Sequence, residues 1–280
     1  MQQLIDKITR NNLTPISEDF SYSMDEKYFN EQYGYQKIPV VIRNAYQHWK
    51  IKEKWTLPYL ILKLPGKESF DSYDKKLSLE EYLKNDFINK LYYKTQCHSS
   101  NELSDDYDIP DELRCWYKNY RKPPKLFLSW LYVGKQNTFS DLHQDLWDTS
   151  AWNYLIKGRK LWFFFPKSLN SIIKADIDSY KIQNIIDNIL NNKDPKLQPL
   201  YCIQNEGDLV YTPSGYYHAV VNLDLTISLT ENFINKTNYD VVYDNFKKNF
   251  DSSTKSLLEI IEYHLKLEKN GKASQDRKNN

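Results

Sequence analysis

The feature that most constrains the fold is a block of short, β-rich runs between residues 125 and 235. The runs are KLFLSWLYVG, AWNYLIKG, KLWFFFP, LYCIQ, DLVYTP, HAVVNL and TISLTENFI, and Gly, Pro, Asn or Asp bounds most of them. Short strands separated by turn signals are typical of an antiparallel barrel or a jelly roll. We therefore expect a mainly β protein with helical additions, whose core is a double-stranded β-helix, a cupin-like jelly roll.

The rest of the chain reads as additions to this block. Residues 1–124 alternate short helices with a few strands, and they are expected to form an N-terminal α/β elaboration that ends at a Pro-Pro break. A helical insert is expected at about residues 168–193, and C-terminal helices at residues 236–269. Residues 270–280 are polar and are expected to be a disordered tail.

Composition gives no support to several classes of partner. The 38 Lys and Arg residues nearly balance the 37 Asp and Glu residues, so the net charge of +1 does not indicate nucleic acid as a partner. No apolar run approaches the roughly 20 residues of a membrane span. Three widely separated cysteines give no disulfide framework. These features favour an intracellular protein, cytoplasmic or nuclear, that does not use a membrane.

A possible metal site begins at His143. On a strand, side chains alternate between faces, so His143 and Asp145 point to the same side. His218 is the best candidate for a third ligand, because it follows a Pro-Ser-Gly turn and starts a strand of the same β-rich block. Two histidines and one carboxylate on one face of an octahedral metal leave three positions open, which suits non-haem Fe(II) with a chelating cosubstrate and O₂.

Lys160 suggests what that cosubstrate is. It closes the turn KGRK and heads the run KLWFFFP, and an inward-pointing ammonium among aromatic side chains would need an acidic ligand. The distal carboxylate of 2-oxoglutarate meets that need, and Thr230 offers a hydroxyl donor nearby in the block. Each residue taken alone also has an ordinary interpretation: an incidental His-x-Asp, a core or surface His218, and a solvated hairpin lysine.

Two segments resemble a known family. HQDLWDTSAWNYLIKGRKLWFFFP and EGDLVYTPSGYYHAVVNLDLTISLTENF look like the JmjC-domain Fe(II)/2-oxoglutarate-dependent oxygenases. TSAWN, soon after His-x-Asp, is typical of the branch that contains the bifunctional arginine demethylase and lysyl-hydroxylase. The similarity covers about residues 85–235. Where that family has Gly-Gly-Trp-Trp-His, this chain has Ser-Gly-Tyr-Tyr-His, ending at His218.

The resemblance implies roles for seven residues. His143, Asp145 and His218 would bind Fe(II) and be catalytic. Lys160, Thr230 and Tyr92 would hold the distal carboxylate of 2-oxoglutarate, and Asn153 would line the cosubstrate site. O₂ would be the second cosubstrate, with ascorbate in support.

The resemblance also implies a reaction, the hydroxylation of a side chain of a protein or peptide substrate, with lysine preferred. Demethylation of histone or protein arginine or lysine is the alternative, followed by a tRNA or small-molecule hydroxylase. Trp147, Tyr216 and Tyr217 are candidates to cradle an aliphatic stem or a cation. A zinc or manganese isomerase or hydrolase on the same barrel, or a cupin-type binding module without chemistry, also stays open.

The C-terminal helix raises the question of assembly. Leu257, Leu258, Ile261 and Leu265 recur at three- and four-residue spacing. They are expected to pack on the chain's own barrel. The alternative is a homodimer through these helices, as in several of the hydroxylases that the chain resembles.

Overall fold

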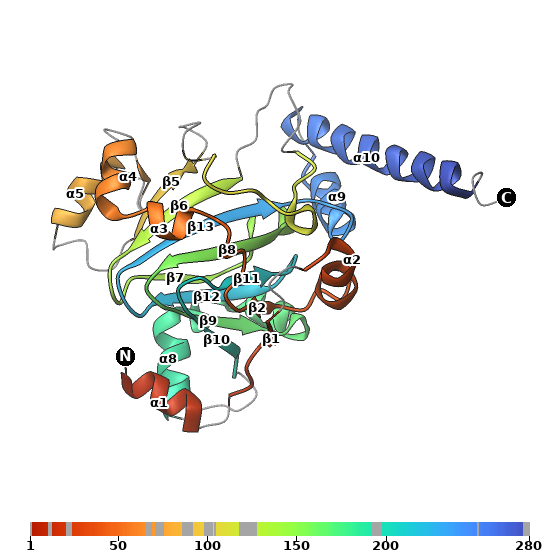
Figure 1. The fold of residues 1–280 in the computed structure, drawn as a ribbon. Helices are drawn as coiled ribbons and strands as arrows, with labels where there is room; N and C mark the ends of the chain where they lie inside the picture. Colours follow the sequence, from red (N-terminus) through yellow and green to blue (C-terminus); the bar gives the residue numbers. More distant parts are fainter. Residues whose placement is uncertain are drawn as a thin grey trace.

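Two sheets form the centre of the molecule (Figure 1). The computed structural model describes residues 2–10, 13–20, 24–64, 69–70, 76–85, 92–97, 103, 105–117, 128–191, 198–250 and 252–276. A seven-stranded sheet has the order β1-β2-β11-β8-β13-β6-β5, and a four-stranded sheet has the order β10-β9-β12-β7. All neighbouring strands in these sheets are antiparallel except β1 and β2. The expected mainly β fold with a jelly-roll core is thus confirmed.

The bounds of the strands are β1 Ser17–Asp19, β2 Val40–Ile42, β5 Tyr92–Gln96, β6 Ser129–Gly134, β7 Phe139–His143, β8 Ser150–Lys157, β9 Lys160–Phe165, β10 Leu200–Gln204, β11 Leu209–Thr212, β12 Tyr217–Asn222 and β13 Thr226–Phe233. A separate two-stranded sheet pairs β3 Ser69–Phe70 with β4 Lys76–Leu77.

The bounds of the helices are α1 Gln2–Arg10, α2 Glu26–Phe29, α3 Ile51–Lys54, α4 Leu57–Lys63, α5 Leu79–Lys84, α7 Asn170–Ala175, α8 Ile182–Asn191, α9 Tyr239–Lys248 and α10 Ser252–Asp276. Shorter helical turns are η1 Asn30–Gly34, η3 Asp111–Leu113, η4 Leu146–Asp148, η5 Lys167–Leu169 and η6 Ile177–Tyr180. None of the described helices combines the length and apolar composition needed to cross a bilayer.

Consecutive strands cross repeatedly from one sheet to the other. From β6 to β13, each strand lies in the sheet opposite its predecessor, except that β9 and β10 share the four-stranded sheet. The helices η5, α7, η6 and α8 lie between β9 and β10 in sequence. This alternation leaves one face of each sheet turned toward the other.

The N-terminal part completes the larger sheet. Strand β2 pairs with β11 at one edge, and β5 pairs with β6 at the other. The boundary expected at residue 124 and the last four residues of the expected tail lie outside the described residues. Helix α10 continues to Asp276, seven residues into the segment expected to be a tail.

Apolar side chains cover the outer faces of both sheets. In β9, Leu161, Phe163 and Phe165 face outward and pack with Leu4 of α1 and Ile185 of α8. A larger cluster covers the outer face of the seven-stranded sheet and includes residues of the N-terminal helices, α9 and α10. The apolar positions of α10 belong to that cluster: Leu257, Leu258 and Ile261 are buried, and Leu265 packs against them.

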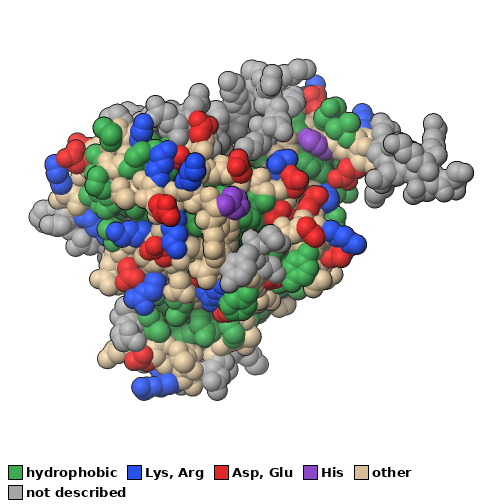
Figure 2. Space-filling model, in the orientation of Figure 1, with side chains coloured by type: hydrophobic (Ala, Val, Ile, Leu, Met, Phe, Trp, Pro, Cys, Tyr) green, Lys and Arg blue, Asp and Glu red, His purple; other side chains and the backbone are tan. Residues whose placement is uncertain are grey.

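Charge is mixed on the surface. On the face that Figure 2 shows, Lys and Arg side chains are intermingled with Asp and Glu side chains. This distribution agrees with the balanced composition of the chain.

One crossing between the sheets requires glycine. Gly158 joins β8 to β9 with φ +85°, and a Cβ at this position would lie 2.4 Å from the backbone oxygen of Leu225. Leu225 belongs to a later crossing, between β12 and β13. The two crossings therefore pack too closely for any side chain.

We expect Gly158→Ala to lower the free energy of unfolding by more than the roughly 1–3 kcal/mol cost of a left-handed non-glycine residue, because backbone must also move. Urea denaturation measures the loss. Gly207→Ala is the matched control: Gly207 also has a positive φ, +89°, but its nearest neighbour is the flexible end of Lys52 at 3.2 Å. Equal losses in the two variants would contradict the packing argument.

Candidate metal and cosubstrate site

A cavity of about 620 Å³ lies between the inner faces of the two sheets. Residues of strands from both sheets, and of the segment that follows β7, line it. They include Tyr92, Lys94, Trp130, Tyr132, His143, Asp145, Asn153, Lys160, Trp162, His218, Asn222 and Thr230. All seven residues that the sequence predicted for the site therefore line one cavity.

The three candidate metal ligands converge at one place in this cavity. His143 ends β7 and His218 lies directly across from it on β12. Their ring centroids are 4.3 Å apart. One ligand atom each from His143, Asp145 and His218 lies within 4.8 Å of the others. This is close enough for all three residues to contact one metal ion.

Backbone carbonyls orient both imidazoles. His143 Nδ1 lies 2.7 Å from the oxygen of Asp141, and His218 Nδ1 lies 3.2 Å from the oxygen of Tyr216. A carbonyl can only accept, so Nδ1 carries the hydrogen in each ring. The lone pair of Nε2 is then left for a metal, which is the usual way in which an outer partner fixes a ligating histidine.

The protonation and hydrogen bonding of the triad fit a cation. Burial, together with the neighbouring imidazole of His143, lowers the pKa of His218 to about 4, so the His218 ring is neutral as a ligand must be. The Oδ2 atom of Asp145 is buried and has no hydrogen-bond partner among the described residues. A buried carboxylate oxygen without a partner is costly, and a divalent cation would satisfy it.

Lys160 lies at the other end of the cavity. It pairs in register with Asn222, which is four residues from His218 along β12, a separation of about 13 Å. The side chain is only 6% exposed, and burial lowers its pKa to about 7. No ion pair joins it to a described carboxylate. An acidic ligand in the cavity would remove the cost of this buried amine.

Polar donors surround the same region. Asn153 and Thr230 are register partners on β8 and β13, and Asn153 Nδ2 donates to Thr230 Oγ1 at 2.5 Å. Tyr92 reaches the cavity from β5, opposite Gly134. The residues expected around a cosubstrate carboxylate therefore come from four strands, β5, β8, β9 and β13.

Sequence reasoning missed a second lysine in the cavity. Lys94 Nζ lies 4.8 Å from the ring centroid of Trp130 and 5.4 Å from that of Tyr132. Burial lowers the pKa of Lys94, and the charge of Asp145 opposes the shift. The signal was present in the sequence, because Lys94 shares a strand face with Tyr92.

The three aromatic residues expected to cradle a substrate do not line this cavity. Trp147 and Asp148 have left-handed backbones, with φ of 55° and 56°, and the Trp147 ring lies 5.3 Å from that of Phe246 in α9. Tyr217 precedes His218 on β12 and so points to the outer face, where it is buried. Tyr216 lies under Lys167, 5.4 Å from its ammonium. The aromatic residues that do line the cavity include Trp130, Tyr132 and Trp162.

Comparison with known proteins identifies the block that holds the site. Residues 130–233 match the family described as "JmjC domain, hydroxylase". The bifunctional arginine demethylase and lysyl-hydroxylase psr-1 of Caenorhabditis elegans is 26% identical over 267 residues, which are 85% of this chain and 63% of that protein. The lysine-specific demethylase JMJ21 of Arabidopsis thaliana is 28% identical over 253 residues, 79% of this chain and 25% of that protein.

A third relative matches a shorter stretch. The 2-oxoglutarate and iron-dependent oxygenase JMJD4 of Mus musculus is 34% identical over 119 residues, 39% of this chain and 26% of that protein. The chain thus spans less than two thirds of the length of each of these three relatives.

The buried amine of Lys160 predicts a pH-dependent stability. Its pKa of about 7 in the folded chain lies below the roughly 10.4 of an unfolded lysine, so the unfolded state binds more protons between these values. The contribution of Lys160 to the free energy of unfolding should therefore rise with pH from about 7 to about 10. Lys160→Met should remove this rise and should stabilise the ligand-free protein at pH 6 by at least about 1.4 kcal/mol, the equivalent of one pKa unit.

Urea denaturation at several pH values measures both effects. Lys157→Met, at an exposed position at the end of the preceding strand β8, is the control and should change neither. A Lys160→Met protein with the pH profile of the unmodified chain would show that the amine reaches solvent.

Proposed function

We propose that the chain, whose residues 130–233 match the JmjC-domain family, is an Fe(II)- and 2-oxoglutarate-dependent oxygenase that hydroxylates a protein side chain, with lysine preferred. The observation that carries the proposal is the convergence of two oriented imidazoles and an unsatisfied carboxylate at one end of a cavity, with a buried unpaired lysine at the other. The first group fits the metal and the second fits the distal carboxylate of the cosubstrate.

In this proposal each residue has a definite task. His143, Asp145 and His218 hold Fe(II) through one face and leave the other face for the cosubstrates. Lys160, Thr230 and Tyr92 bind the distal carboxylate of 2-oxoglutarate, and Asn153 holds the Thr230 hydroxyl in place. Bound iron with 2-oxoglutarate and O₂ supplies the oxidation that converts C–H to C–OH and releases succinate and CO₂. Ascorbate supports the reaction by keeping the metal as Fe(II).

The choice of lysine rests on likeness to the relative that is named for both activities, psr-1. Hydroxylation and demethylation begin with the same attack on a C–H bond. A methylene carbon keeps its hydroxyl group, whereas an N-methyl carbon gives a hemiaminal that loses formaldehyde. Demethylation of arginine or lysine is therefore the alternative within the same proposal.

Lys94 favours a second candidate, the hydroxylation of an uncharged or acidic side chain. Its ammonium lies over the rings of Trp130 and Tyr132 and covers aromatic faces that a substrate cation would otherwise use. A protonated lysine or arginine that entered beside Lys94 would meet a like charge. Comparison of lysine-, asparagine- and aspartate-centred peptides separates the two candidates.

A homodimer through α10 also belongs to the proposal. The buried positions of α10 are covered by the chain's own core, so such a dimer would use the exposed Tyr263 and Leu267. Light scattering distinguishes monomer from dimer.

Two variants should separate the metal from the cosubstrate. Asp145→Ala should abolish the conversion of 2-oxoglutarate to succinate, because it removes one of three metal ligands. Lys160→Met should leave Mn(II) binding intact and weaken 2-oxoglutarate binding about 10- to 100-fold, the value of a charge-assisted hydrogen bond to a desolvated carboxylate. Unchanged succinate production by Asp145→Ala, or unchanged 2-oxoglutarate affinity in Lys160→Met, would reject the corresponding assignment.

The product identifies the reaction. Lysine-rich peptides incubated with the protein, Fe(II), ascorbate and 2-oxoglutarate should gain the mass of one oxygen on lysine without release of formaldehyde. Mass spectrometry and a formaldehyde assay measure these outcomes. Formaldehyde from methylated peptides, with no product from unmodified ones, would place demethylation first. Metal binding without any turnover of 2-oxoglutarate would favour an isomerase, a hydrolase or a binding module.

A further inference from the structure

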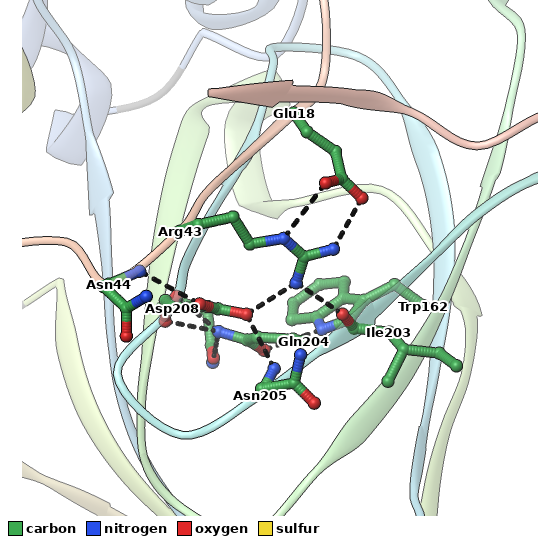
Figure 3. A network of polar contacts seen from close by, with 9 residues as sticks. Glu18, Arg43, Asn44, Trp162, Ile203, Gln204, Asn205 and Asp208 are labelled. Atoms are coloured by element: carbon green, nitrogen blue, oxygen red, sulfur yellow. Dashed lines mark hydrogen bonds and ion pairs between the residues drawn. The ribbon is translucent and has the colours of Figure 1, made fainter. Parts of the chain in front are cut away.

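A buried amide joins the two sheets behind the cosubstrate wall of the cavity. Gln204 ends β10 in the four-stranded sheet and is fully buried. Its Oε1 accepts from Trp162 Nε1 at 2.8 Å, and its Nε2 lies 3.2 Å from Asn153 Oδ1 in the seven-stranded sheet. Figure 3 shows Gln204 beside Trp162 at the centre of a larger polar network. Gln204 itself does not line the cavity.

The direction of each hydrogen bond in this group is fixed by chemistry. An indole N–H can only donate, so the oxygen of Gln204 must face Trp162. Nε2 of Gln204 also lies 2.9 Å from the backbone oxygen of Asn153 and 3.1 Å from that of Asp208, and these atoms can only accept. The contacts at the oxygen and at the nitrogen of the Gln204 amide therefore agree on one orientation, in which Oε1 faces Trp162 and Nε2 faces Asn153.

The same reasoning extends to the cavity. The two hydrogens of Gln204 Nε2 serve three acceptors, so one of them is shared. The atom of Asn153 that faces Nε2 must be its Oδ1, because its amide nitrogen there would set two donors against each other. The amide nitrogen of Asn153 therefore faces Thr230, to which it donates at 2.5 Å. The Thr230 oxygen accepts this bond, so its own hydrogen is available to an acceptor in the cavity, which Thr230 lines. A carboxylate only accepts, and it would receive this hydrogen.

We propose that Gln204 is a positioning residue for cosubstrate binding: through Asn153 it sets the Thr230 hydroxyl to donate to the distal carboxylate. This rests on the proposed function. We call Trp162, Gln204, Asn153 and Thr230 the amide relay. If the Asn153 amide turned over, Thr230 would donate to Asn153 and present lone pairs to the carboxylate, which repel it.

The relay also reaches the metal end of the cavity. Trp162, which Gln204 holds by its indole nitrogen, lies with its ring 5.9 Å from that of His218 at an interplanar angle of 25°. Gln204, which lies outside the cavity, thus contacts both the Trp162 ring beside His218 and, through Asn153, the Thr230 hydroxyl.

The position of Gln204 is held from the N-terminal part of the chain. Arg43, next to β2, donates to Asp208 at 2.6 Å and to the backbone oxygen of Ile203 at 2.8 Å, and it pairs with Glu18 of β1 (Figure 3). Asp208 lies in the turn that follows Gln204, and its backbone oxygen accepts from the Gln204 amide. The Asp208 side chain is buried and that of Arg43 is only 16% exposed, so their ion pair is largely shielded from water.

The test measures 2-oxoglutarate binding by calorimetry on Mn(II)-loaded protein without oxygen, so it does not depend on turnover. Gln204→Met should raise the dissociation constant for 2-oxoglutarate about tenfold, equivalent to about 1.4 kcal/mol, and leave Mn(II) affinity within about threefold. In a Thr230→Val background the same substitution should change the constant less than about threefold, because the hydroxyl that it orients is gone. If Gln204→Met raised the dissociation constant equally in the unmodified chain and in the Thr230→Val background, Gln204 would have a merely structural role and the proposal would be overturned.

Control variants separate the possible failures. Asn238→Leu removes another buried amide, which bonds to Phe233 and Asn235 outside the cavity, and it should leave 2-oxoglutarate affinity unchanged. Thr230→Ser should retain affinity and Thr230→Val should lose it; equal affinities would overturn the relay even if Gln204→Met did not fold. An unmodified chain that does not bind 2-oxoglutarate would reject the proposed function, whereas normal binding in Gln204→Met would reject the relay alone.

Discussion

The structure depends on one constraint, which is that polar side chains placed between two sheets must find partners there. A jelly roll encloses the inner faces of its strands, and burial of an unpaired polar atom costs free energy. Asn153, Gln204, Thr230 and Trp162 satisfy one another across the space between the sheets. Asp145 and Lys160 do not find full partners among the described residues, and they mark the two places where ligands belong.

Much of this arrangement could be predicted from the sequence because a strand has a simple period. Lys160 heads a strand whose alternate residues are inward, so its direction follows from the pleat. His143 and Asp145 are two residues apart, and although β7 ends at His143, the backbone of Asp145 is still extended, so the expected common direction holds. The pairing of strands that are far apart in the sequence was harder to predict. Nothing local in the sequence places His218 opposite His143, and the Pro-Ser-Gly turn only indicated that a strand begins there. Resemblance to a family, rather than period, indicated Tyr92 and Asn153.

The failures have physical causes as well. Trp147 follows Asp145 closely in sequence, and alternation would have kept it near the cavity, but two consecutive left-handed residues turn its ring onto α9. Such a backbone is rare outside glycine and has no reliable sequence signal at Trp or Asp. The prediction that Tyr217 contacts a substrate was wrong because it rested on the size of the side chain. Tyr217 is one residue from His218 on the same strand, so its side chain lies on the opposite face of the sheet. Gln204 could not be found from the sequence, because its role depends on contacts between residues 51 and 42 positions away.

The arrangement of the large sheet also bears on where this domain ends. The stretch that matches the JmjC family begins at residue 130 and ends at 233, yet β2 and β5 lie outside it and cap the two sides of the sheet that it forms. A fragment cut to the matched stretch would expose the hydrogen-bonding edges of β11 and β6, together with the apolar surface that the N-terminal helices cover. Open strand edges are templates for association between chains. The unit that can be inherited or transplanted as a folded body is thus larger than the segment in which family likeness is strongest.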